Sequence, residues 1–134
     1  MRKPNSIPEF ASQRSSLLIK NFRESIARQS VISAKKAFQE AADAPAPRFW
    51  VSEARATRII SLMMRGVDLT EGMIPEKRKM YLEIFSRVKR LREKLPQAPL
   101  GDLVFEVVNN PAPSSFISPV SVARIVYSHK KRKP

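Results

Sequence analysis

The chain has 134 residues and a mass of 15.2 kDa, enough for one domain or at most two very small ones. Its 25 Lys and Arg outnumber its 12 Asp and Glu, and a formal net charge of +13 points to a polyanionic partner. With no cysteine and one histidine, the sequence excludes a disulfide framework and a thiolate zinc site, and we expect no catalytic residues, cofactor or metal.

Residues 1–9 contain two prolines and no periodicity, and we interpret them as a flexible basic arm. Beyond them, apolar residues recur at helical spacing and no segment has the pattern of a strand. The sequence therefore predicts an all-α fold of about six helices in a single domain over residues 10–130, followed by a basic tail at 131–134. The expected helices span about residues 10–29, 33–43, 53–65, 75–94, 100–109 and 119–130.

Proline, serine and glycine mark several of these helix ends. The run Ala44-Pro45-Ala46-Pro47 stops the second helix, because proline supplies no amide and disfavours helical geometry before it. Ser52 and Ser118 stand where an N-cap is needed, and Gly66 follows the third helix. Pro75 suits the first turn of a long basic helix over residues 75–95.

An internal repeat is the strongest pattern in the chain. With a shift of 66 residues, FQEAADAPAPRFWVSEARATRII aligns with VFEVVNNPAPSSFISPVSVARIV without a gap, and seven of the 23 positions are identical. The match covers a helix end, a proline turn, an apolar cluster, a cap and a second helix. We therefore expect two duplicated helix-turn-helix-like pairs, in repeat units over about residues 34–66 and 100–131. The long basic helix would join them, and the first helix would precede them.

Duplicated helix pairs build solenoids and bundles, but they also build DNA-binding helix-turn-helix motifs. The second helix of each pair carries a stripe of mostly basic and hydroxyl side chains on its outward face. Glu53 is the one acidic residue near either stripe. Arginine can bind guanine or phosphate through two hydrogen bonds, and serine can bind bases or phosphates. We predict that nucleic acid is contacted by Arg48, Arg55, Arg58, Arg65, Ser121, Arg124, Ser128, Lys130, Lys131, Arg132 and Lys133.

Two observations keep a structural interpretation open. Arg58 and Arg124 occupy the same place in the two copies, so each could instead form an ion pair with Glu40 or Glu106 of its own repeat. The turn between the paired helices is also about eight residues long, whereas a helix-turn-helix motif has a turn of about three or four.

The segments PAPRFWVSEARATRIISLMMRG, PEKRKMYLEIFSRVKRLREKLP and DLVFEVVNNPAPSSFISPVSVARIV together resemble a family of small basic proteins of bacteria and their phages. Its members are grouped as uncharacterised DNA-binding proteins, so the resemblance implies DNA binding but supplies no site residues. The layout, two helical pairs joined by a long helix, is similar to that of AraC-type DNA-binding domains, whose sequence motifs this chain lacks.

The function we expect is binding of double-stranded DNA, as a transcriptional regulator or an accessory factor of a mobile element. Association with RNA or the ribosome and a protein–protein interaction module are the alternatives. No segment approaches the roughly 18 apolar residues that a membrane span requires. No apolar run of a secretory signal follows the basic amino end, so we expect a cytoplasmic protein without a membrane partner.

Overall fold

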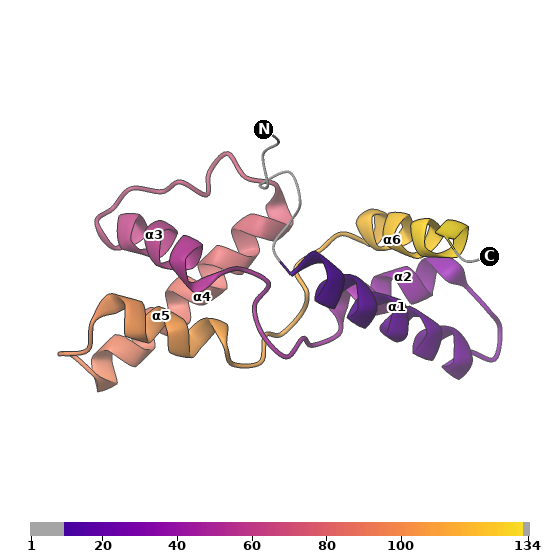
Figure 1. Ribbon diagram of the computed structural model, residues 1–134, viewed down its shortest axis with the longest axis horizontal. Helices are drawn as coiled ribbons and strands as arrows, with labels where there is room; N and C mark the ends of the chain where they lie inside the picture. The colour runs from indigo at the N-terminus through magenta and orange to yellow at the C-terminus, as the bar shows by residue number, and fades with distance from the viewer. Residues whose placement is uncertain (1–9, 133–134) are drawn as a thin grey trace. The chain divides into compact units, whose positions relative to one another are not determined.

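The computed structural model describes residues 10–132, with side chains as far as Lys130. The described residues form six helices and no strand, which confirms the all-α prediction, and each helix begins and ends within two residues of the expected position (Figure 1). None of these helices is long and apolar enough to cross a membrane. The arm at residues 1–9 and residues 133–134 of the tail lie outside the described residues. The helices are α1 (Ala11–Arg28), α2 (Ala34–Asp43), α3 (Glu53–Met64), α4 (Pro75–Lys94), α5 (Leu100–Val108) and α6 (Pro119–Arg132).

Local signals fix the ends of these helices as expected. The Ser52 hydroxyl accepts a hydrogen bond from the backbone amide of Arg55 at 3.1 Å, and Ser118 accepts one from Ser121 at 3.2 Å. Both predicted N-caps are therefore confirmed. Pro75 is the first residue of α4, where its missing amide costs no helical hydrogen bond. Gly66 has a φ of 89° after α3, a conformation that favours glycine.

The helix contacts divide the chain into two compact units, whereas the sequence suggested one domain over residues 10–130. The first unit contains α1, α2 and α6, and we call it the α1–α2–α6 unit. The second contains α3, α4 and α5, and we call it the α3–α4–α5 unit. Within each unit all three helices pack against one another, as Figure 1 shows. The long basic helix α4 is therefore a packed member of one unit and not a linker between two pairs.

The 66-residue shift relates all six helices in pairs. The third helix of each copy is exchanged, because it packs in the unit formed by the first two helices of the other copy. The shift places α1 on α4, α2 on α5 and α3 on α6. Each unit thus combines the first two helices of one copy with the third helix of the other copy. We expected α2 to pair with α3 and α5 with α6, but the packed pairs are α2 with α6 and α5 with α3. The backbone of Ala44 and of Ser52 is extended on either side of the proline turn, as expected for a residue before proline and for an N-cap.

The exchanged helices complete an apolar core in each unit. Val122 of α6 is fully buried against the first two helices, and its counterpart Ala56 of α3 is also fully buried. In α5 the buried positions form one stripe, and Phe105 on the opposite side of the helix is 55% exposed. The core cluster of the α1–α2–α6 unit comprises Leu18, Phe38, Ala41, Ala42, Val122 and Val126. The fully buried residues of the other unit include Phe49, Ile60, Ile84, Val88, Leu103 and Val104.

Candidate nucleic-acid interface

Arg58 of α3 and Arg124 of α6 are the best-placed of the predicted contact residues. Both side chains are exposed, and each lies on the side of its helix away from the buried stripe. Within residues 10–132, no hydrogen bond or ion pair engages either guanidinium group. Their guanidinium groups are therefore available to an anionic ligand, and the repeat presents one of them in each unit.

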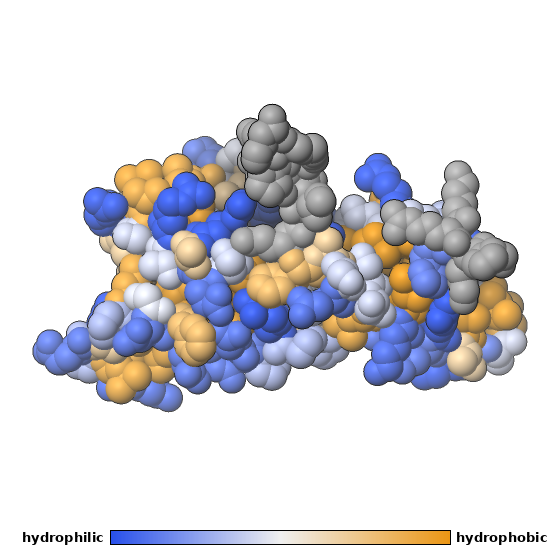
Figure 2. Space-filling view, in the orientation of Figure 1, coloured by the Kyte–Doolittle hydropathy of each residue, from blue (hydrophilic) through white to orange (hydrophobic). Residues whose placement is uncertain are grey.

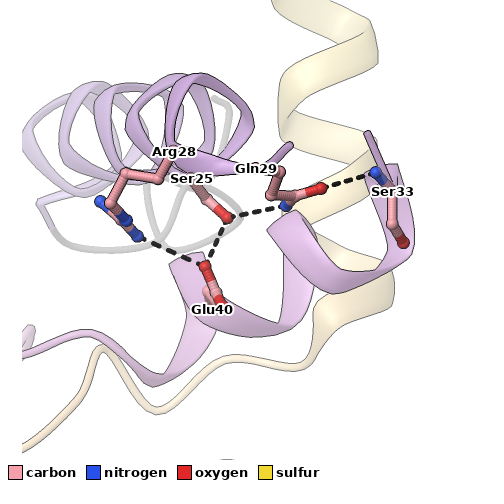
Figure 3. Close-up of polar contacts among 5 residues, drawn as sticks. All are labelled: Ser25, Arg28, Gln29, Ser33 and Glu40. Atoms are coloured by element: carbon pink, nitrogen blue, oxygen red, sulfur yellow. Dashed lines mark hydrogen bonds and ion pairs between the residues drawn. The ribbon is translucent and has the colours of Figure 1, made fainter. Parts of the chain in front are cut away.

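The structural alternative for these two arginines is not realised among the described residues, where both glutamates bind other partners. Glu40 of α2 accepts a hydrogen bond from the Ser25 hydroxyl of α1 at 2.5 Å, and Arg28 approaches the same oxygen at 3.3 Å (Figure 3). Glu106 accepts a hydrogen bond from Asn110 at 3.0 Å. The hydrogen bond from Ser25 is the main cause that lowers the pKa of Glu40, with further contributions from the nearby cations.

Arg48 forms hydrogen bonds that stabilise the fold, and it does not belong to an exposed stripe. Its guanidinium donates to the carbonyl oxygens of Phe49 and Val51, each at 2.8 Å, and to the Asn109 side chain at 3.1 Å. Asn109 in turn donates to Glu53 at 3.0 Å, and this bond is the main cause that lowers the pKa of Glu53. These bonds hold the turn against the end of α5, so we leave Arg48 out of the candidate interface.

The other predicted residues of α3 lie at its two ends. Arg55 is exposed in the first turn, where its amide is bound by the Ser52 cap. Arg65 is exposed at the C-cap of the same helix. Together with Arg58 they give α3 three exposed arginines over about three turns, as the stripe predicted.

In α6 the predicted stripe is only partly exposed. Ser121 is half-buried and its hydroxyl accepts a hydrogen bond from Ser118, whereas Ser128 and Lys130 are exposed. The backbone of Lys131 and Arg132 continues α6, but their side chains lie beyond the described part of the chain, as does all of Lys133. His129 belongs to α6, and its Nε2 atom lies 3.4 Å from Nη2 of Arg23 in α1.

The excess of positive charge differs between the two units. Over its described residues, the α1–α2–α6 unit has ten Lys and Arg against three Asp and Glu, a net charge of +7. The α3–α4–α5 unit has twelve against eight, a net charge of +4. On the face shown in Figure 2, hydrophilic side chains are interspersed with apolar ones over both units. Both units can therefore attract a polyanion, and the α1–α2–α6 unit has the larger excess.

Three exposed residues of the α1–α2–α6 unit were missed in the sequence. Lys35 and Lys36 of α2 and Tyr127 of α6 lie outside the two expected stripes. The two lysines could have been recognised as exposed cations from their position in the first turn of α2. The sequence did not show, however, that α2 packs against α6. Among residues 10–132, no group of three or more His, Cys, Asp or Glu side chains is placed to hold a metal ion.

Comparison with protein-family models, curated proteins and solved structures finds no match to this chain. The resemblance to small basic DNA-binding proteins therefore stays a prediction.

Proposed function

We propose that the protein binds double-stranded DNA through the exposed arginines of α3 and α6. The observation that carries this proposal is the equivalent position of Arg58 and Arg124, both exposed and both without a protein partner in the described chain. A duplicated helical unit that keeps an unpaired arginine in each copy, within a chain of net charge +13, suits a repetitive polyanion.

The aromatic side chains favour a duplex over single-stranded RNA as the ligand. Recognition of single strands commonly stacks bases on exposed aromatic rings. Every aromatic residue of this chain lies within the described part, and only Phe105 and Tyr127 are exposed. These two belong to different units, so neither unit presents adjacent exposed rings as a stacking platform. The charged surface is better suited to phosphates and groove edges than to splayed bases.

The salt dependence of binding tests the proposal directly. We expect the affinity of the full chain for a labelled duplex, measured by fluorescence anisotropy, to fall steeply between about 50 and 200 mM salt, because each neutralised phosphate releases counterions. A competing structured RNA should displace the duplex only at higher concentration than unlabelled duplex does. A salt slope near zero, or stronger competition by the RNA, would overturn the proposal.

The double variant Arg58→Ala with Arg124→Ala tests the role of the two arginines. We expect weaker binding and loss of discrimination among duplexes, by about 1–3 kcal/mol for each base contact that is removed. Selection from random duplexes by the wild-type chain supplies the preferred sequence. The matched control is Lys at both positions, which keeps the charge but loses the two-pronged hydrogen bonding, so the salt slope should persist while discrimination falls. Unchanged binding and discrimination in the alanine variant would contradict the assignment.

A further inference from the structure

An aromatic contact joins α2 to α6 at the surface of the α1–α2–α6 unit. The Phe38 ring of α2 stacks on Phe22 of α1 with centroids 4.9 Å apart. Its edge meets the Tyr127 ring of α6, with centroids 5.8 Å apart and an interplanar angle of 76°. Phe38 is buried, whereas Tyr127 stays 54% exposed. The contact therefore fixes one part of the tyrosine ring and leaves a large part of this side chain accessible to solvent.

One exposed cation stands a helical turn away from this contact on each helix. Lys35 precedes Phe38 by three residues on α2, and Arg124 precedes Tyr127 by three residues on α6. Residues three apart are neighbours on the surface of a helix, so each cation lies beside the ring on its own helix. Both cations are exposed, and no ion pair among the described residues involves either one. We call Lys35, Tyr127 and Arg124 the seam patch.

The equivalent surface of the α3–α4–α5 unit retains only the arginine. The 66-residue shift places Gly101 where the seam patch has Lys35, and Ser61 where it has Tyr127. Arg58 remains as the counterpart of Arg124. On α5 the neighbouring position is Asp102, which is exposed, where α2 has the exposed Lys36. The two copies thus differ in charge at the very positions that flank the exchanged helix.

We propose that the seam patch makes the α1–α2–α6 unit the main duplex-binding surface of the protein. Lys35 and the Tyr127 hydroxyl contact the phosphate backbone, while Arg124 contacts phosphate or base edges of the adjoining groove. This inference rests on the proposed DNA-binding function and assigns it unequally to two homologous units. Charge complementarity selects the ligand, because this unit combines a net charge of +7 with exposed donors on two packed helices.

Matched single variants of the full chain test this inequality. We expect Lys35→Ala and Arg124→Ala each to weaken binding by about fivefold to tenfold near 0.1 M salt and to lower the salt slope by about one unit, as loss of one phosphate contact requires. The matched comparisons remove the same residue types from the other unit. Arg58→Ala, which belongs to the proposed interface, should weaken binding by about threefold, less than Arg124→Ala does. The control is Lys77→Ala, at an exposed lysine of α4 outside the interface, and it should weaken binding by less than about twofold.

Tyr127→Phe separates the hydroxyl from the packing of the ring. It keeps the contact with Phe38, so thermal unfolding should be unchanged while affinity for the duplex falls. Equal losses for Arg124→Ala and Arg58→Ala, or no loss for Lys35→Ala, would overturn the seam patch. In those cases the wild-type chain would still bind the duplex, whereas failure of the proposed function itself would show as absence of salt-dependent binding by the wild type.

Discussion

Ser25 is a fully buried polar residue whose hydroxyl is satisfied by two neighbours. It accepts a hydrogen bond from Gln29 at 3.1 Å and donates one to Glu40 at 2.5 Å, so it ties α1 to α2. Gln29 also accepts a bond from the amide of Ser33 at 2.6 Å, just before α2 begins (Figure 3). A buried hydroxyl with two good partners costs little and fixes the register of the two helices.

The pH dependence of stability should reveal the bond from Ser25 to Glu40. This bond favours the ionised carboxylate and lowers the pKa of Glu40 in the folded chain. The bond therefore contributes stability above the ordinary carboxyl pKa of the unfolded chain, and the contribution is lost as the pH falls through the lowered pKa. We expect Ser25→Ala to be less stable than wild type at about pH 7, with a smaller difference at about pH 3, in urea unfolding.

The exposed Ser16, on the same helix, supplies the control for this measurement. Ser16→Ala should leave stability unchanged at both pH values. A difference between wild type and Ser25→Ala that does not shrink in acid would show that the hydroxyl acts through packing and not through the carboxylate.

At the scale of the helix, α3 and α6 are both capped by a serine hydroxyl, although the residues of their first turns differ. Glu53 follows the cap of α3, whereas Pro119 follows the cap of α6. In both helices a serine hydroxyl binds the amide three residues ahead, at 3.1 Å and 3.2 Å. Each cap therefore holds one end of an exchanged helix, next to the exposed arginine of its second turn.

We expect Ser52→Ala and Ser118→Ala each to lower the free energy of unfolding by about 1 kcal/mol, because an amide of the first turn loses its partner. Chemical denaturation followed by circular dichroism measures the change. Ser52→Asp and Ser118→Asp should recover most of the loss, since aspartate also caps helices. If alanine and aspartate were equally destabilising at these positions, the hydroxyl would not be acting as a cap.

At the scale of the molecule, the exchange of α3 and α6 makes distant segments interdependent. Val122 of α6 is fully buried in the cluster formed with Leu18 of α1 and Phe38 of α2. Ile60 of α3 is fully buried in the unit that contains α4 and α5. The loss of an apolar side chain from α6 should therefore be felt by helices about a hundred residues earlier in the chain.

Hydrogen exchange can detect this dependence. We expect Val122→Ala to cost about 2 kcal/mol and to reduce amide protection in α1 and α2 more than in α5, its neighbour in the chain. Ile60→Ala should show the reverse pattern, with loss of protection in α4 and α5. If Val122→Ala instead reduced protection mainly in α5, the helices would be paired in chain order and the exchanged arrangement would be wrong.

The equivalence of α1 and α4 cannot be recognised from residue identity. Under the 66-residue shift these helices share no identical residue, so the repeat was visible only from α2 onward. One central buried position nevertheless corresponds: Leu18 and Ile84 are both fully buried. Burial constrains polarity and volume more than residue identity, and the equivalence therefore survives in the packing after it has been lost from the sequence.

The sequence by itself determined the helices, their caps and proline stops, the excess of positive charge and the equivalence of Arg58 with Arg124. These features depend on local rules of spacing, capping and composition. Only the tertiary structure decided that α2 packs against α6, that Arg48 is used to hold the turn, and that Phe38 of α2 contacts Tyr127 of α6. The physical reason is that α3 and α6 present similar apolar stripes, so either could cover α2, and the partner is chosen by contacts between residues far apart in the chain.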